Sequence, residues 1–315
     1  MIFALVAGDG PVRSLPAEEA ASYHGPGFIW THLEGQDDFL AAGADATIPD
    51  VAANALVATE TRPRCDAIDH GAILNLRGLG AGDAEPADRL VSIRMWVQGH
   101  RVLSASRHPM PATDTVRAKM EAGKIHDSGD LVAAYAWAIS TQLDPEIAAL
   151  GDKLDDVESS LEPSHLYRLR RAITAVRTEA ISFRRFVAPD RDALSTLPGL
   201  GFDWLAEDDR LHIVEAADRF ARMAEELEAV RERAALLHEQ ITDLRAEQVD
   251  QRALYISIVA FIFLPLTFIT GLLGMNVEGI PYAQHPGSFW AIVAFCVATG
   301  IGVFAWFYWR HWINR

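Results

Sequence analysis

Two long stretches near the C-terminus contain no charged residue. The first spans 25 residues, from Ala253 to Val277, and the second spans 21, from Phe289 to Trp309. At about 1.5 Å of rise per residue, each is long enough to cross a hydrocarbon layer of ~30 Å as a helix. The pattern predicts membrane helices at 253–275 and 289–309, a connecting loop at 276–288 and a tail at 310–315.

A second apolar pattern leads directly into the first of these stretches. Its members recur at alternating spacings of three and four, as in a coiled-coil seam: Phe220, Met223, Leu227, Val230, Ala234, Leu237, Ile241 and Leu244. The seam predicts one helix from about residue 206 into the membrane, with a stalk over 206–252. Such a stripe must pack on other helices of the chain or on copies of itself.

The first 125 residues alternate short apolar runs with Gly, Pro and Asp, as is typical of strands and turns. We expect strands at 28–33, 67–74, 90–97 and 102–105, a tight hairpin at 98–100, and helices at 49–59 and 112–122. The fold class is therefore an α+β domain, an α/β/α sandwich with a small sheet, whose long stalk helix continues into a two-helix transmembrane hairpin.

A glycine-rich segment from Gly78 to Asp83 comes close to a dinucleotide-binding fingerprint. The third glycine of that fingerprint would fall on Asp83, and a strand rather than a helix is expected to follow at Leu90. The segment is therefore predicted to be a hairpin loop.

Opposite charges divide the segment 126–205. Residues 127–162 contain nine acidic residues and one lysine, whereas residues 168–192 contain seven arginines and three acidic residues. With a break at 163–165, the pattern favours an antiparallel helical hairpin held by opposite charges, then a linker over 189–201. A second interpretation is that these arginines bind phosphate or lipid head groups.

The charge balance narrows the classes of partner. The net charge is −15, and residues 251–315 carry three Arg and one Glu, which leaves −17 on residues 1–250. A strongly acidic soluble part argues against nucleic acid as a partner and suits a protein that handles cations, although acidity also serves solubility alone.

The orientation of the predicted membrane hairpin follows from the positions of the basic residues and from the N-terminal sequence. Arg252, Arg310 and Arg315 flank one side of the hairpin, and the loop at 275–288 has no Lys or Arg. The positive-inside rule then places both termini in the cytoplasm. The first residues have no basic region ahead of their apolar run, so no signal peptide is expected.

The enzyme and zinc-site motifs that the sequence approaches are incomplete. His238-Glu239 begins an HExxH pattern, but Thr242 stands where the second His is needed. Cys65 and Cys296 are too few for a Cys-rich zinc site or a disulfide framework. We expect neither catalysis nor a resident cofactor.

The first membrane helix has a distinct face. Small and hydroxylated residues share one stripe of a helical wheel, with Leu264 and Thr270 at its margins: Ala253, Ile256, Ala260, Thr267, Gly271 and Gly274. Such a stripe allows close helix packing or a narrow pore lining, and the pattern alone favours packing. Pro265 predicts a kink in this helix. Beyond the stripe, Asn276 is placed where a pore mouth would lie. Glu278 and His285 would either concentrate cations around it or be polar loop residues that face water.

The segment FLPLTFITGLLGMNVEGIP, at residues 263–281, adds a family resemblance. Together with the two C-terminal helices, the acidic stalk and the N-terminal domain, it resembles the CorA superfamily of two-transmembrane GxN divalent-cation transporters, and most closely its ZntB zinc-transporter branch. The resemblance implies a homopentamer in the bacterial inner membrane with a funnel-shaped cytoplasmic domain.

The resemblance also implies roles for individual residues. Gly274, Met275 and Asn276 would form the entrance ring, with Glu278 beside it. The pore would be lined by Asp250, Ala253, Ile256, Ala260, Leu264, Thr267 and Gly271. Partners are then the chain itself, the lipid bilayer and divalent cations. Regulatory divalent cations in the acidic part are a further expectation, to which the sequence assigns no residues.

The transported ion is expected to be Zn2+, with Cd2+ or Ni2+ as further substrates. Gly-Met-Asn is typical of magnesium-carrying members, but the following VEGIP resembles the VGGIP of the zinc branch, with Glu278 in place of a glycine. The membrane segments offer a single thiol, so passage as a hydrated ion is favoured over tight coordination. The alternatives are a Mg2+ or Co2+ channel of the same fold, or a membrane-anchored coiled-coil scaffold or sensor that transports nothing.

Overall fold

A computed structural model describes residues 2–8, 10–20, 22–35, 48–58, 62–82, 90–162, 165–280, 282 and 284–313. The chain divides into two compact units. The first comprises Met1–Leu161 with Tyr167–His238, and the second comprises Glu162–Leu166 with Glu239–Arg315.

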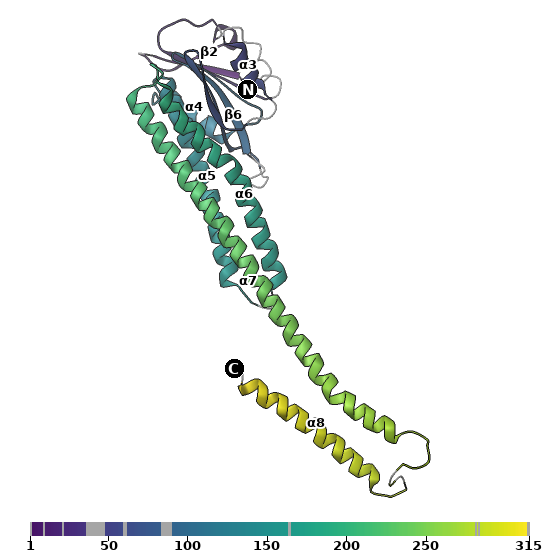
Figure 1. Cartoon of the computed structure of the whole chain (residues 1–315). Coiled ribbons are helices and arrows are strands. Elements are labelled where there is room, and N and C mark those ends of the chain that lie inside the picture. The colour runs from purple at the N-terminus through teal and green to yellow at the C-terminus, as the bar shows by residue number, and fades with distance from the viewer. Residues whose placement is uncertain are drawn as a thin grey trace. The chain divides into compact units, whose positions relative to one another are not determined.

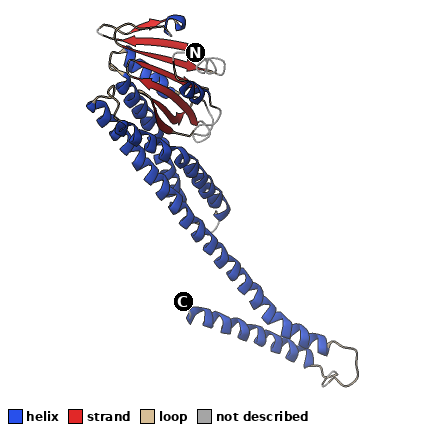
Figure 2. Cartoon of the chain, turned by 45° about the horizontal axis from the view of Figure 1, so that its top comes forward, coloured by secondary structure: helices blue, strands red, loops and turns tan. Residues whose placement is uncertain are grey.

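Within the described residues, seven strands form one mixed sheet in the order β2-β1-β3-β7-β6-β5-β4 (Figure 2). Their bounds are β1 Ile2–Ala7, β2 Arg13–Leu15, β3 Phe28–Glu34, β4 Arg64–Ile68, β5 Gly71–Leu79, β6 Leu90–Gln98 and β7 Arg101–Ser106. Neighbouring strands are antiparallel except β3 and β7, which pair in parallel with Trp30 opposite Val102.

Three expected strands are confirmed as β3, β6 and β7, and Gln98 pairs with Arg101 across the expected tight turn. The strand expected at 67–74 is wrong, because a turn at Asp69 and His70 divides this stretch between β4 and β5. Asp69 adopts a positive φ of 50°, which short polar side chains tolerate. The glycine-rich segment lies partly in β5, which extends to Leu79, and residues 83–89 fall outside the described residues.

Helices cover both faces of the sheet, which confirms the expected sandwich. On one face, α3 (Asp50–Val57) packs over a core that includes Leu33, Trp96 and Leu103. On the other face, Tyr135 of α5 (Ser128–Ser159) meets the ring of Trp30 edge-on at 5.8 Å between centroids. Two further helices, α1 (Ala17–Ala20) and α4 (Pro111–Glu121), complete this layer arrangement.

Within the first unit, α5 lies beside α6 (Leu166–Thr196) and the N-terminal part of α7 (Glu207–Leu273) (Figure 1). The predicted seam supplies the apolar face of α7, since Phe220, Met223, Leu227 and Ala234 are each at most 2% exposed. Ile173, Val176 and Phe183 of α6 are buried as well. The seam therefore packs on helices of the same chain, one of the two expected arrangements.

The ion pairs of these three helices differ from the predicted charge-complementary hairpin. One ion pair between α5 and α6 joins Lys153 to Glu179 at 3.4 Å, which is the reverse of the expected polarity. Arg184 of α6 instead pairs with Glu228 of α7 at 3.0 Å. Arg233 of α7 binds Asp155 of α5 at 2.6 Å. The complementary partners of the α6 arginine and the α5 carboxylate therefore lie on α7, which the prediction from charge did not include.

The predicted linker over 189–201 is wrong. Pro189 lies inside α6, which continues to Thr196 and is followed by a 3-10 turn, η2 (Leu197–Leu200). Val187, Leu194 and Leu197 are at most 1% exposed. Burial of these side chains stabilises the helix enough to tolerate the proline within it.

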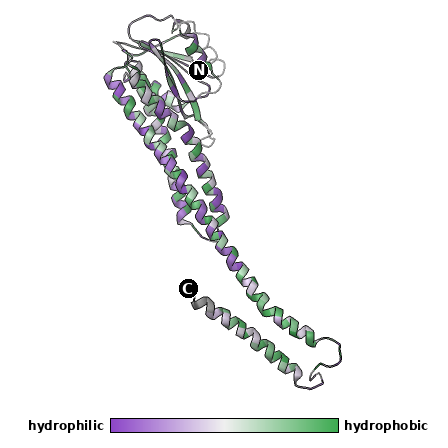
Figure 3. Cartoon of the chain, in the orientation of Figure 1, coloured by the Kyte–Doolittle hydropathy of each residue, from purple (hydrophilic) through white to green (hydrophobic). Residues whose placement is uncertain are grey.

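The second unit contains the two apolar helical stretches. The C-terminal part of α7 and α8 (Ser288–Ile313) are the most hydrophobic helical segments of the chain (Figure 3). Both helices are long and apolar enough to cross a membrane. Pro265 lies within α7, which continues as a helix to Leu273.

Candidate functional site

One face of α7 packs against α8. Partly buried residues recur at helical spacing along both helices, among them Ile258, Ile262, Leu266, Ile269 and Leu273 on α7, and Ile292, Cys296, Gly300, Val303 and Phe307 on α8. Gly300 lies next to Ile262 across the two helices, where a Cβ would lie 4.0 Å from Ile262 Cγ2, at ordinary contact distance. The rings of Phe261 and Phe307 meet edge-on at 6.0 Å between centroids. These residues form the hairpin seam.

The predicted stripe lies on the other side of α7. All its members are exposed in the single chain: Ala253, Ile256, Ala260, Leu264, Thr267, Gly271 and Gly274. At about 100° per residue, the centre of the stripe is about 160° around the helix from the hairpin seam. Ile256 and Leu264 are 70% and 76% exposed. The stripe is therefore not used to pack α8, and it faces other copies, water or lipid.

Asp250 does not join the stripe. It is exposed on α7, but it lies about 80° around the helix from the centre of the stripe. The seven other predicted pore-lining and mouth positions from Ala253 to Gly274 share one face, so Asp250 is the outlying member of the set.

Hydroxyl groups on α7 bind their own helix. Thr267 Oγ1 donates to the carbonyl of Phe263 at 2.7 Å, and Thr270 Oγ1 donates to that of Leu266 at 2.9 Å. Ser257 does the same toward Ala253 at 2.8 Å. Because the proton is used within the helix, lone pairs of the oxygen are left to accept hydrogen bonds. Thr267 thus presents an acceptor on the stripe, suited to the water shell of a cation.

The helix ends where the Gly-Met-Asn tripeptide begins. The Gly274 amide donates to the Thr270 carbonyl at 2.9 Å, and a Cβ at Gly274 would lie only 2.9 Å from that oxygen. Met275, Asn276 and Glu278 follow outside the helix and are exposed. Gly279, with φ of 103°, completes the turn after Glu278. An exposed amide and an exposed carboxylate therefore follow the end of the stripe two residues apart in the sequence.

The loop before α8 is held by hydrogen bonds of its own. His285 Nδ1 accepts from the Gly287 amide at 3.2 Å, and Ser288 Oγ donates to the Tyr282 carbonyl at 2.8 Å. One nitrogen of His285 is thus engaged in the loop, which favours a structural role for this residue over the cation-attracting one. Pro281 lies outside the described residues.

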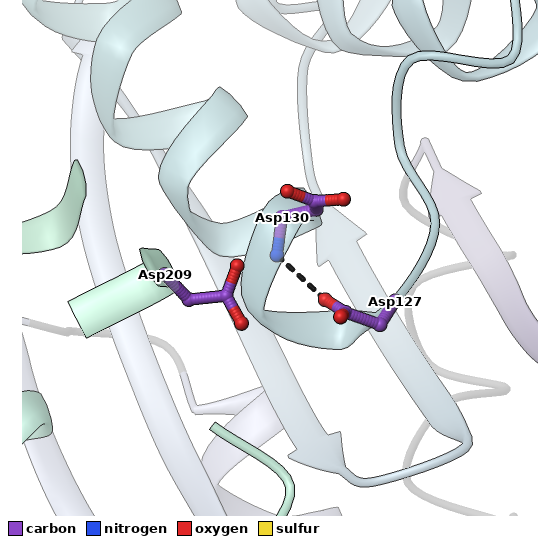
Figure 4. Close-up of side chains that lie close together, drawn as sticks. All are labelled: Asp127, Asp130 and Asp209. Carbon is purple, nitrogen blue, oxygen red and sulfur yellow. Dashed lines mark hydrogen bonds between the residues drawn. The ribbon is translucent and has the colours of Figure 1, made fainter. Parts of the chain in front are cut away.

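Three carboxylates that the sequence did not single out converge in the first unit. Oxygen atoms of Asp127, Asp130 and Asp209 lie within 4.8 Å of one another (Figure 4). Each caps a helix start: Asp127 accepts from the Asp130 amide at 2.9 Å, Asp130 from the His126 amide at 2.9 Å, and Asp209 from the Ala206 amide at 3.1 Å. Two helix N-termini meet here, and their amides and dipoles explain the cluster without a metal ion.

Replacing Asp209 with asparagine is expected to stabilise the protein by about 1–3 kcal/mol near pH 7.5. Burial, followed by the charges of Asp127 and Asp130, raises the pKa of Asp209 from 3.8 to about 6. The folded state therefore loses stability as pH rises between these values, and the loss persists above them. Asparagine keeps an acceptor for the Ala206 amide and removes the charge.

Thermal unfolding of the full chain in detergent at about pH 4 and about pH 7.5 measures this effect. The exposed Glu207→Gln, in the same first turn of α7, is the matched control and should shift the midpoint little. A lower midpoint for Asp209→Asn at the higher pH, with a wild-type protein that Mg2+ or Zn2+ stabilises, would instead identify a cation site.

Comparison with known proteins covers nearly the whole chain. The family described as CorA-like Mg2+ transporter protein matches residues 25–310. The zinc transport protein ZntB of Pectobacterium atrosepticum is 29% identical over 98% of this chain and 92% of its own length. The divalent cation transporter CmaX of Pseudomonas aeruginosa is 33% identical over 90% of this chain and 86% of its own. The solved structure of full-length CmaX aligns with a TM-score of 0.77 at 30% identity, covering 98% of this chain and 96% of that one.

Proposed function

Because the chain belongs to the CorA family, we propose that it moves divalent cations across the bacterial inner membrane through a pore formed by five copies. Zn2+ is the proposed main substrate, with Cd2+ and Ni2+ as further ones. Both termini would lie in the cytoplasm and residues 276–287 outside, in agreement with the positive-inside rule.

The observation that carries this proposal is the exposed stripe of α7, opposite the hairpin seam and ending at Gly-Met-Asn. Since two membrane helices cannot enclose a water-filled path, several copies must contribute. With α8 occupying one side of each α7, the stripe is the face left to line a central pore. Small residues would let the helices approach closely, and Leu264 would form an apolar constriction.

The chemistry at the mouth suits a hydrated cation. Asn276 supplies a neutral amide oxygen, which binds a divalent ion or its water shell weakly enough to release it. Glu278 adds one carboxylate per copy and would raise the local concentration of cations. Further along, the Thr267 oxygen accepts hydrogen bonds from the water shell. Weak successive contacts of this kind permit passage without dehydration.

The choice of Zn2+ rests on two observations. The VEGIP sequence after the tripeptide resembles that of the zinc branch, and the relative from Pectobacterium atrosepticum is named a zinc transport protein. The family description names Mg2+, which makes a Mg2+ or Co2+ channel of the same fold the second candidate.

Flux into liposomes decides between these substrates. Purified protein is expected to pass Zn2+ faster than Mg2+ when each is measured in parallel with an ion-specific fluorescent indicator. Empty liposomes give the background, and repetition with and without a pH gradient shows whether protons contribute to the driving force. A clear preference for Mg2+ would replace zinc transport with the second candidate.

A further inference from the structure

Two neighbouring helices of the first unit carry opposite charges that do not pair with each other. On α6, three exposed arginines form no ion pair with any described residue: Arg170, Arg171 and Arg177. On α5, the same holds for three exposed aspartates: Asp144, Asp152 and Asp156. Both helices are described from end to end, and the two undescribed residues between them are Pro163 and Ser164, which carry no charge.

The arginines lie on the part of α6 that extends away from the sheet (Figure 1). Asp190 marks where α6 meets the sheet, because its Oδ1 accepts from the Arg77 amide of β5 at 2.9 Å. Arg177 precedes Asp190 by 13 residues, or about 20 Å along the helix. The undescribed stretches that contain acidic residues connect elements of the sheet and α3 in the sequence: 36–47, 59–61 and 83–89.

The fold turns the two sets of charges onto different outer faces. Lys153 and Glu179 occupy the side on which α5 and α6 touch. Asp152 lies about 100° around α5 from Lys153, and Arg177 lies about 160° around α6 from Glu179. The unpaired aspartates and arginines therefore do not meet within one chain.

The arginines belong to a stripe along the exposed side of α6. Its members recur at alternating spacings of three and four: Tyr167, Arg170, Thr174, Arg177 and Ile181. Tyr167 and Ile181 are 76% and 49% exposed, although both side chains are large and mainly apolar. Tyr and Arg are also the residue types that anchor protein interfaces. This outer stripe of α6 has the spacing of a helix-packing seam, and none of the described helices covers it.

α5 carries a row that complements this stripe. The members of the row are exposed and four residues apart, so they form one ridge of the helix: Asp144, Ala148, Asp152 and Asp156. Ala148 is the uncharged member, and its small side chain leaves room for a bulky one. Burial, and then the charge of Asp144, raise the pKa of Glu226 on α7, so Asp144 lies near another carboxylate. This acidic row of α5 lacks cations, as the outer stripe of α6 lacks anions.

The stripe and the row lie at matching heights along the bundle. α5 and α6 are antiparallel neighbours, and the Lys153–Glu179 pair places these two residues at about the same height (Figure 1). Counted from this pair, Ile181 lies within about 5 Å of the height of Ala148, and Arg177 within about 2 Å of that of Asp156. Rotation about an axis along the bundle leaves heights unchanged, so a closed ring of copies can bring the two surfaces together.

We propose that the outer stripe of α6 in one copy packs against the acidic row of α5 in the next copy, and that this contact repeats around the ring. The proposal rests on the proposed function, in which several copies assemble. Arginines of one copy would meet aspartates of its neighbour, and Ile181 would rest on Ala148. Because the two surfaces differ, the contact is head-to-tail, as a ring of more than two copies requires. A lipid surface would satisfy the arginines alone and leave the aspartates unpaired.

Cross-linking between two differently tagged copies tests this contact. Both full-length proteins carry Cys65→Ser and Cys296→Ser, one adds Ile181→Cys and the other Ala148→Cys, and they are produced together in one membrane. A short bismaleimide is expected to join them at least about fivefold more than when Ala175→Cys replaces Ile181→Cys. Ala175 is the matched control, because it is exposed on the same helix but lies about 120° around it from Ile181.

Charge reversal tests the ionic part of the contact. Arg170→Glu with Arg177→Glu, added to the Ile181→Cys copy, is expected to lower the cross-linked yield about fivefold or more, since like charges then face each other. Asp152→Arg with Asp156→Arg in the other copy should restore the yield to within about twofold. All four side chains are exposed, so unfolding midpoints should change little. A loss that this second reversal does not restore would assign the arginines to another partner, such as anionic lipid, and would overturn the proposal.

Light scattering of the full chain in detergent separates this inference from the proposed function. If the chain is oligomeric but the Ile181→Cys and Ala148→Cys copies cross-link no better than the control, the contact is wrong and assembly uses other surfaces. If the chain is monomeric, both this contact and the proposed pore of five copies are wrong. Neither measurement depends on ion transport.

Discussion

Replacing Asn276 with alanine is expected to reduce Zn2+ flux into liposomes roughly tenfold or more. The substitution removes the amide oxygen at the end of the exposed stripe, where five copies would present it to the entering ion. A methyl group offers no hydrogen bond to the water shell, so the ion would have to enter through a less polar opening. Initial rates with a Zn2+ indicator, at equal protein content, measure the loss.

Gln284→Ala is the matched control for this experiment. Gln284 is another exposed amide in the same loop, outside the tripeptide. Its removal should leave flux within about twofold of wild type if the position of Asn276, and not amide content, is what counts. An Asn276→Ala protein that folds, assembles and transports at the wild-type rate would favour the membrane-anchored scaffold or sensor instead.

A cysteine at position 267 is expected to make flux sensitive to a positively charged methanethiosulfonate reagent, with a loss of roughly tenfold or more after labelling. Thr267 lies on the exposed stripe, so the added group would put both bulk and positive charge into the proposed pore. The background protein carries Cys65→Ser and Cys296→Ser. Burial raises the pKa of Cys65 to about 12, so this thiol would react slowly in any case.

Phe268→Cys in the same background provides the comparison. Phe268 is 70% exposed, yet it lies about 100° around the helix from Thr267 and off the stripe. Labelling there should leave flux nearly unchanged. If the reagent blocked Phe268→Cys and spared Thr267→Cys, the pore would be lined by a different face of α7 from the one proposed.

The sequence predicted the elements with a strong local pattern. Charge-free stretches identified the two apolar helices, and the spacing of Phe220 to Leu237 identified the packed face of α7, because both signals repeat over many residues. Local patterns failed where tertiary packing decided the outcome. Pro189 reads as a linker residue, but the burial of Val187 and Leu194 keeps it within α6.

The candidate sites show the same contrast between what a local pattern predicts and what tertiary packing decides. The stripe and the Gly-Met-Asn tripeptide occupy one continuous segment, so their relation was visible before the fold. Which face of α7 meets α8 was not visible, since both faces are apolar. The cluster of Asp127, Asp130 and Asp209 was not predictable for another reason. Asp209 is far from the other two in the sequence, and only the packing of the two helix starts brings the three carboxylates together.

The internally bound hydroxyls of α7 have a consequence for biogenesis. Ser257, Thr267 and Thr270 each satisfy their proton on a carbonyl of the preceding turn, so these three groups need no partner from another copy inside the bilayer. Under the proposed function, a newly made chain could therefore enter the lipid alone, with its stripe facing acyl chains, before it meets other copies. Insertion and assembly would then be separate steps, and the number of working pores would depend on the density of chains in the membrane.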